Sequence, residues 1–290
     1  MSFAAPASGV RNPARHAHIV DVLIAERAPK LAGSAVWPLL RPLFYAILDY
    51  GKARRMADAI VDLSGSQALD HVMRLLALKV TAQGLEQVPR QGRCIVVCNH
   101  PTGIADGMAV FDALGTVRRD LNFYANADAH RVCRRFDEVL IPVEWVEEKR
   151  TRERMRATLT LTRDAMQADR CLVIFPAGRI SRRQADGSLR DKDWMTSAVS
   201  IARRYEAPIL PLHVSGPWSR LFHFFHGFSG ELRDITLFHE LLNKRGQAFA
   251  LTAGPLISTA ALEGDPAVVT ARLQTYVERD LPGDLPRAFA

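Results

Sequence analysis

From Lys79 onward, short β-rich runs alternate with stretches whose apolar residues recur at helical spacing. The runs that predict strands are KVTAQG at 79–84, CIVVCN at 94–99, LNFYAN at 121–126, VLIPV at 139–143, CLVIF at 171–175, PILPLHV at 208–214 and AFALTAGPLI at 248–257. Among and after them, amphipathic patterns predict helices at 151–168, 197–204 and 266–279. This alternation predicts an α/β fold with a mostly parallel central sheet flanked by helices.

The segment before Lys79 has a different residue pattern, which is helical throughout. Apolar positions recur at helical spacing through residues 19–78, and Ser64-Gly65-Ser66 breaks the last two predicted helices apart. We therefore expect an N-terminal helical extension over residues 1–78 and an α/β catalytic domain over residues 79–290. The 290 residues of the chain are enough to bury a substantial core.

Two segments carry apolar residues in patterns that suit a membrane interface. Residues 36–48 are largely apolar but are interrupted by Arg41 and two prolines, which favours lying in the interface over crossing it. Residues 221–228 mix phenylalanine and histidine in the manner of an interfacial anchor. Ordinary packed helices remain the alternative for both segments. No uninterrupted run reaches the roughly 18 apolar residues of a membrane span.

The charge and the cysteines narrow the possible partners and the compartment. A formal net charge of +7 predicts attraction to a polyanion, which nucleic acid, an anionic bilayer or an acidic carrier protein would each satisfy. The four cysteines have neither the paired spacing of a zinc module nor the density of a disulfide scaffold, which favours a reducing cytosol. The first fifteen residues lack the apolar core of a signal peptide, so we expect the chain on the cytosolic side.

The most informative stretch is CIVVCNHPTGIADGMAVF at 94–111. An apolar strand ends at Asn99-His100-Pro101, and a helix-compatible run begins near Ile104, so His100 should lie in a loop beyond the carboxyl end of a strand. Asp106 would fall in the first helical turn and reach back to an imidazole nitrogen. Such a pair has the parts of a general base and the group that orients it. The alternative is an ordinary loop histidine next to a capping asparagine.

Two further strand-to-loop junctions follow. At 171–183, the strand CLVIF runs into Pro176, Gly178 and a basic cluster, where free backbone amides beside Arg179 or Arg182 would form an anion site for a phosphate or carboxylate. A solvated turn is the plain alternative there. At 208–216 another buried strand ends in small polar residues, and its His213 is more typical of a core or near-site histidine than of the base.

Taken in order, these blocks resemble the lysophospholipid acyltransferase superfamily (1-acylglycerol-3-phosphate acyltransferase-like), in particular its hemolysin-like branch related to ornithine-lipid acyltransferases. The likeness spans residues 79–257. It is carried by the Asn99-His100 to Asp106 block, NFYAN at 122–126, FPAG at 175–178, ILPLHVSG at 209–216 and ELLNKRG at 240–246.

The resemblance implies a catalytic pair and a substrate site. It implies His100 and Asp106 as the catalytic residues and the Gly178 block as the site for the head group of the acceptor. We assign substrate binding to Asn99, Thr102, Gly103, Pro176, Gly178, Arg179, Ser181 and Arg182. The amides near Thr102 and Gly103, or those around Gly178, are candidate donors to the reaction oxyanion.

The chain departs from the family pattern in two places. The usual H-x4-D spacing is H-x5-D here, and Gly103 would accommodate the extra residue in the turn. The usual F-P-E-G-T has lost its acid, because Ala177 stands where glutamate is expected and Arg179 replaces threonine. The reaction type is therefore better defined than the acceptor.

The resemblance implies an acyltransferase that moves a fatty acyl group from acyl carrier protein (ACP) or coenzyme A to lysophosphatidic acid or a lyso-ornithine-type lipid. One neutral histidine suffices to activate a hydroxyl toward a thioester, so we expect no metal and no cofactor beyond the thioester co-substrate. We further expect peripheral attachment at the cytoplasmic face of the inner membrane, on an anionic surface.

Two rival functions remain. A thioesterase or lipid hydrolase would use Cys98 or a serine as nucleophile near His100, although an apolar strand buries Cys98. A non-catalytic basic module would bind membranes or nucleic acid through KRTRERMR at 149–156. That run lacks interleaved aromatics and follows two glutamates, which predicts the solvated start of a helix, so we expect no nucleic-acid partner.

Overall fold

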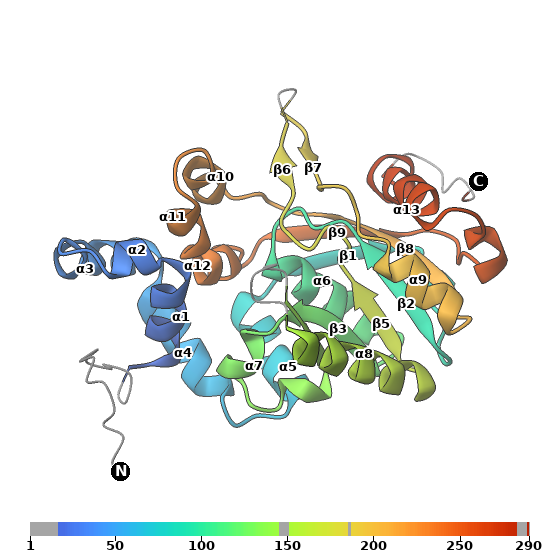
Figure 1. The fold of residues 1–290 in the computed structure, drawn as a ribbon, viewed down its shortest axis with the longest axis horizontal. Helices are drawn as coiled ribbons and strands as arrows, with labels where there is room; N and C mark the ends of the chain where they lie inside the picture. Colours follow the sequence, from blue (N-terminus) through green and yellow to red (C-terminus); the bar gives the residue numbers. More distant parts are fainter. Residues whose placement is uncertain (1–16, 145–150, 185–186, 283–288, 290) are drawn as a thin grey trace, which may run out of the picture.

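The computed structural model describes residues 17–144, 151–184, 187–282 and 289. A seven-stranded sheet with the order β1-β9-β8-β2-β5-β3-β4 forms the middle layer between two layers of helices (Figure 1). Its strands are β1 (Lys79–Gln83), β2 (Cys94–Cys98), β3 (Leu121–Asn126), β4 (Leu140–Val143), β5 (Cys171–Ile174), β8 (Ile209–Ser215) and β9 (Ala248–Ala253). All seven predicted strands are therefore confirmed, with ends shifted by a few residues.

The sheet is parallel except at one pair of neighbours. β8 and β9 run antiparallel, with Leu212 opposite Ala253, whereas every other adjacent pair in the sheet is parallel. The mostly parallel sheet that the alternation predicts is thus confirmed. The reversal of β9 brings its first residues, and those of β1, to the edge of the sheet where β2 ends.

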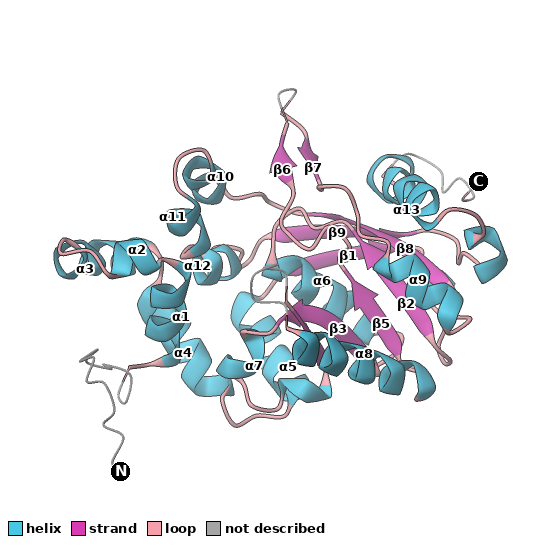
Figure 2. Ribbon diagram, in the orientation of Figure 1, coloured by secondary structure: helices cyan, strands magenta, loops and turns pink. Residues whose placement is uncertain are grey.

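Alternating side chains of β2 pack into two separate hydrophobic cores. Cys94, Val96 and Cys98 face one core, while Ile95 and Val97 face the other, and all five are fully buried. Burial on both faces explains why this strand reads as one continuous apolar run. The helix layers seen on either side in Figure 2 cover these two faces.

The first layer contains the N-terminal helices and the helix that follows β2. Its helices are α1 (Ile19–Arg27), α2 (Pro29–Ala32), α3 (Trp37–Ile47), α4 (Tyr50–Ile60), α5 (Gly65–Leu76), α6 (Ile104–Gly115), α7 (Ala129–Val132) and α12 (Leu237–Leu242). Ser64 caps α5 in a capping box with Gln67, which accounts for the break that the sequence predicts there. Buried residues of the N-terminal helices, such as Leu76, share one continuous core with the sheet.

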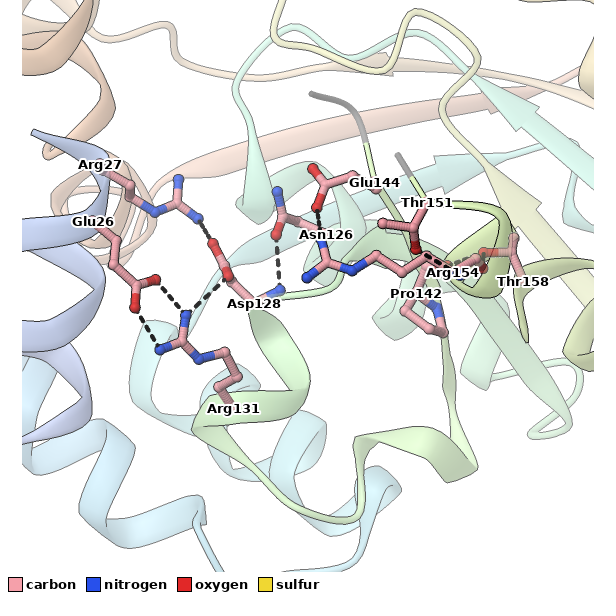
Figure 3. Close-up of polar contacts among 10 residues, drawn as sticks. All are labelled: Glu26, Arg27, Asn126, Asp128, Arg131, Pro142, Glu144, Thr151, Arg154 and Thr158. Atoms are coloured by element: carbon pink, nitrogen blue, oxygen red, sulfur yellow. Dashed lines mark hydrogen bonds and ion pairs between the residues drawn. The ribbon is translucent and has the colours of Figure 1, made fainter. Parts of the chain in front are cut away.

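Polar contacts fasten α1 to the segment after β3 (Figure 3). Arg27 pairs with Asp128 at 2.7 Å, and Glu26 accepts hydrogen bonds from both terminal nitrogens of Arg131. The side-chain oxygen of Asn126, the last residue of β3, accepts a hydrogen bond from the amide of Asp128 at 2.8 Å. The N-terminal helices are therefore joined to the sheet by ion pairs as well as by packing.

The second layer consists of α8 (Arg152–Gln167), α9 (Ser197–Arg204) and α13 (Pro266–Thr275), which a π-helical turn at Tyr276–Asp280 extends. These are the three helices predicted from amphipathic patterns. Short 3₁₀ helices occur at Leu85–Gln87, Phe136–Glu138 and Thr259–Leu262. The basic run at 149–156 is described only from residue 151, and there its arginines are exposed, in agreement with a solvated helix start.

Three elements stand at the edge of the sheet where β2 ends. They are the hairpin of β6 (Arg182–Arg183) and β7 (Leu189–Arg190), and the helices α10 (Arg220–His226) and α11 (Gly230–Asp234) (Figure 1). Within the described residues, no helix combines the length and apolar character needed to traverse a bilayer.

Candidate active site

His100 lies two residues beyond the end of β2, and Asp106 lies in the first turn of α6. The imidazole Nδ1 and a carboxylate oxygen of Asp106 are 2.9 Å apart, so the hydrogen bond that the spacing predicts is present. Asp106 is fully buried, whereas 18% of the His100 side chain is exposed. Because Nδ1 is engaged, Nε2 is the nitrogen that remains to face a substrate.

Three more donors fix the carboxylate of Asp106. The amides of Thr102 and Gly103 donate to it at 2.9 and 3.0 Å, and the Thr102 hydroxyl donates at 2.6 Å. An acid at this position satisfies amides that the start of α6 would otherwise leave unpaired. Both amides, which are one of the two candidate sets of oxyanion donors, therefore already donate to Asp106.

Gly103 makes the longer H-x5-D turn possible. Its φ of +99° lies where side chains are strained, and a Cβ there would approach the Ile180 side chain to 2.9 Å. The extra residue is thus absorbed at the one position of the turn that has no side chain, and Ile180 closes over it.

Asn99 has a bridging role in the structure. Its amide nitrogen donates to the Val214 carbonyl at 2.9 Å, and its oxygen accepts from the Val214 amide at 2.7 Å. The side chain is buried and joins the ends of β2 and β8. Both polar side-chain atoms of Asn99 therefore bind the backbone of β8. These hydrogen bonds fix the start of the loop that carries His100.

The FPAG block lies against the same loop. The Phe175 ring is 4.6 Å from the imidazole of His100, and the Ser181 amide donates to the His100 carbonyl at 2.8 Å. Pro176 is buried and accepts a backbone hydrogen bond from Met195, and the Gly178 amide donates to the Phe175 carbonyl. The two blocks singled out from the sequence therefore meet, but the Gly178 amide is engaged within its own turn.

The two candidate arginines differ in exposure. Arg179 is exposed, while Arg182, at the start of β6, is half-buried. Ala177 is buried at the position where the family carries glutamate. The loop after β5 thus presents guanidinium groups without the acid that the family pattern would place there.

Asp191 belongs to the site but was not identified from the sequence. Both of its carboxylate oxygens lie 3.2 Å from the His100 amide, and they also accept from the Ser181 hydroxyl and the Trp194 indole. Burial raises the pKa of Asp191, which these hydrogen bonds oppose. In the sequence, Asp191 is marked only by a tryptophan three residues later, and this spacing does not by itself indicate a functional residue.

A buried ion pair lies in the ELLNKRG segment. Glu240 and Lys244 are each at least 98% buried, Lys244 Nζ is 3.4 Å from Glu240, and the Ser219 hydroxyl donates to Glu240 at 2.7 Å. Burial lowers the pKa of Lys244, while Glu240 and the more distant Asp106 oppose this shift. The hydrogen bond from Ser219, the N-cap of α10, ties α12 to the start of α10.

Cys98 and His213 do not form a second catalytic set. Burial, followed by the charges of Asp106 and Asp191, raises the pKa of Cys98 well above its ordinary value, so the side chain stays a thiol. His213 Nδ1 lies 2.9 Å from the Val277 carbonyl in the second core, and burial lowers its pKa. In the described part of the chain, histidine, cysteine and acidic side chains form no group of three suited to a metal ion.

The known proteins that this chain resembles are acyltransferases. Residues 79–215 match the family model described as Acyltransferase. A lyso-glycine lipid O-acyltransferase of Phocaeicola vulgatus is 29% identical over 66% of this chain and 68% of its own length. A protein of the same name from Bacteroides thetaiotaomicron is 26% identical over 67% and 71%.

Among solved structures, the chain is similar to the 1-acyl-sn-glycerophosphate (LPA) acyltransferase PlsC of Thermotoga maritima. The TM-score is 0.46 at 14% identity, and the alignment covers 91% of this chain and 95% of the other.

Proposed function

Since the chain is an acyltransferase of the lysophospholipid acyltransferase superfamily, we propose that His100 and Asp106 catalyse transfer of a fatty acyl group from a thioester to the hydroxyl of a lysolipid. One observation carries this proposal. His100 Nδ1 is held by a buried carboxylate that has four hydrogen-bonding contacts, at the carboxyl end of a central strand.

The chemistry follows from this hydrogen bond. Nε2 of His100 takes the proton of the acceptor hydroxyl as that oxygen attacks the thioester carbonyl. The tetrahedral intermediate then expels the thiolate, which receives the proton from the imidazolium. Asp106 stabilises the imidazolium and holds the ring in the tautomer that leaves Nε2 free to accept. No metal and no covalent enzyme intermediate enters this sequence.

For the acceptor, we propose a lyso-aminolipid that bears a carboxylate. The two curated relatives are named for lyso-glycine lipid, and the loop after β5 has arginines but lacks the usual acid at Ala177. A carboxylate or phosphate is the complement of a guanidinium. Lyso-glycine and lyso-ornithine-type lipids both fit this description, and lysophosphatidic acid, whose anionic group is a phosphate, is the competing acceptor. The donor is acyl-ACP or acyl-CoA.

An open groove of about 800 Å³ offers room for acyl chains. It lies between α3 and the α10–α11 segment, the two regions with interfacial patterns in the sequence. Its apolar lining is Leu31, Val36, Leu40, Phe44, Phe228 and Leu232. The groove supports the proposal that acyl chains pass along this side of the protein.

The surface around the groove supports peripheral attachment to the cytoplasmic face of the inner membrane. Leu39 and Leu43 on α3 are 81% and 58% exposed, and Phe224 and Phe228 are 68% and 70% exposed. Such large apolar side chains gather at surfaces that bind partners or membranes. The net charge of +7 adds attraction to anionic lipids.

A direct assay tests the proposal. Purified protein is incubated with acyl-ACP or acyl-CoA and a panel of lysophosphatidic acid, lyso-glycine lipid and lyso-ornithine lipid, and products are read by mass spectrometry. We expect an ester on the lipid hydroxyl with at least one donor. Release of free fatty acid at the same rate with and without any acceptor would instead indicate a thioesterase.

A further inference from the structure

A cavity of about 320 Å³ lies between α4, α5 and the end of α12. Its volume is typical of a small-molecule pocket. Four of the side chains that line it are apolar, namely Met56, Leu75, Leu76 and Leu242, and four are basic, namely Lys52, Arg55, His71 and Arg245. No acidic side chain of the described residues lines it. The cavity is therefore suited to a ligand that carries an anion beside an apolar group.

Two of the basic groups are free to bind an anion. Lys52 Nζ lies 2.7 Å from a carboxylate oxygen of Asp49, so its charge is already balanced. Arg55 and Arg245 are exposed, and neither guanidinium has an ion pair or a hydrogen bond with another described residue. A guanidinium binds a phosphate or a carboxylate through paired N–H donors. Because no acid of the described chain competes inside the cavity, both arginines are available to a bound anion.

The cavity lies at the same edge of the sheet as His100. Leu76 precedes β1 and Arg245 precedes β9, and both strands begin at the edge where β2 ends. Two strand spacings separate β9 from β2 and three separate β1 from it, which at about 4.8 Å each places the cavity roughly 10–15 Å to the side of His100. α12 packs against both α4 and α6, and α6 begins at the loop of His100 (Figure 1). A ligand bound in the cavity would therefore need a long arm to reach His100.

We propose that this cavity binds the phosphate of the phosphopantetheine arm that carries the acyl thioester. The inference rests on the proposed acyl transfer and adds a site for the donor. Acyl carrier protein and coenzyme A both present the thioester at the end of this arm, so the site would serve either donor. Arg55 and Arg245 would bind the phosphate through charge-assisted hydrogen bonds.

The structure of the arm matches the cavity in two respects. Its phosphate lies close to a carbon that bears two methyl groups, so the anion has an apolar neighbour, just as basic and apolar side chains together line the cavity. The pantetheine chain separates the phosphate from the thioester, so the phosphate must bind at a distance from His100. The phosphate of an acceptor lipid, by contrast, is only a few bonds from the hydroxyl that reacts.

Equilibrium binding tests the site independently of catalysis. Phosphopantetheine and pantetheine, which differ only in the phosphate, are titrated into the full-length protein in a calorimeter. We expect wild type to bind phosphopantetheine at least about tenfold more tightly, and Arg55→Gln or Arg245→Gln to lose most of this difference. Arg54→Gln is the matched control, because Arg54 is exposed on the same helix but does not line the cavity. Equal binding of the two compounds by wild type would overturn the inference.

Kinetics with acylated forms of the same two compounds place the site in the reaction. Arg55→Gln should raise the KM for acyl-phosphopantetheine at least about fivefold and leave the KM for the lysolipid unchanged. The rates of the variant and of wild type with acyl-pantetheine, which lacks the phosphate, should differ little, and circular dichroism checks that the variant is folded. A higher KM for the lysolipid, with the KM for the donor unchanged, would place the acceptor in this cavity and contradict the inference.

A phosphate from a membrane lipid is the other source of the same chemistry. If Arg55→Gln and Arg245→Gln weakened binding to phosphatidylglycerol vesicles but left the KM for the donor unchanged, the cavity would bind lipid and the donor assignment would be wrong. A higher KM for acyl-CoA alone, with acyl-phosphopantetheine and acyl-ACP unchanged, would assign the cavity to the nucleotide phosphates of coenzyme A instead. Preferential binding of phosphopantetheine without acyl transfer from any donor would support the site and refute the proposed function.

Discussion

Both carboxylate oxygens of Asp191 lie 3.2 Å from the backbone amide of His100, although the two residues are 91 positions apart in the sequence. The same carboxylate also binds the Ser181 hydroxyl and the Trp194 indole. One buried group thus fixes the backbone of His100, the proposed general base, relative to the loop that follows β5.

We predict that Asp191→Asn lowers kcat about tenfold and leaves the KM for the acceptor nearly unchanged, because Asp191 positions His100 without facing the substrate. The amide keeps one acceptor oxygen for three donors, so the free energy of unfolding should fall by about 1–3 kcal/mol. Steady-state kinetics and urea unfolding measure the two effects. Asp193→Asn is the control, because Asp193 is exposed two residues away. A rise in KM with unchanged kcat would place Asp191 in substrate binding instead.

Asp106→Asn should lower kcat by roughly a hundredfold or more. The asparagine amide can donate to Nδ1 and so favour the wrong tautomer, and it no longer stabilises the imidazolium. The variant should also lose stability, because Asp106 is fully buried and accepts from two amides and a hydroxyl. Acyl-transfer rates are to be compared at matched folded fractions, established by circular dichroism. Wild-type turnover by folded Asp106→Asn would exclude the role assigned to it.

The structure shows why part of the site could be predicted from the sequence and part could not. His100 and Asp106 are six residues apart, so local turn geometry brings them together, and the fully buried β2 left a continuous apolar run before them. Asp191 could not be predicted, because only the fold brings it to His100. The hairpin at Arg182–Arg190 was not predicted, because strands of two residues are too short to show a hydrophobic pattern. The antiparallel direction of β9 was not predicted either, because the alternation of apolar and polar residues along a strand is the same in both directions.

His223 should make stability depend on pH. Burial and neighbouring arginines lower its pKa from 6.5 to about 4, so between these values the unfolded chain binds the proton more readily than the folded protein. Stability contributed by the neutral imidazole should therefore be lost as the pH falls from about 6.5 toward 4. Urea midpoints at pH 7.5 and 5 measure this. His223→Gln should show a smaller drop than wild type, and equal drops would refute the assignment.

The exposed apolar surface of α3 should govern attachment to lipid. We predict that wild-type protein floats with anionic vesicles, that high salt weakens but does not abolish this, and that Leu39→Glu reduces it at least about tenfold. Leu159→Glu is the control, because Leu159 is similarly exposed, at 64%, but lies on α8. If both variants bound vesicles like wild type, or if wild type failed to bind at low salt, α3 would not be the attachment surface.

The most direct test of the central claim is a single-turnover measurement of acyl transfer by wild type and His100→Ala. Excess enzyme is mixed with an acyl thioester and a lysolipid, and the diacylated product and any acylated enzyme are followed by mass spectrometry. We predict that His100→Ala retains its fold but forms product at least about a hundredfold more slowly, with no acylated enzyme in either sample. Product formation by His100→Ala at nearly the wild-type rate, or an acyl group trapped on wild-type enzyme, would contradict the account.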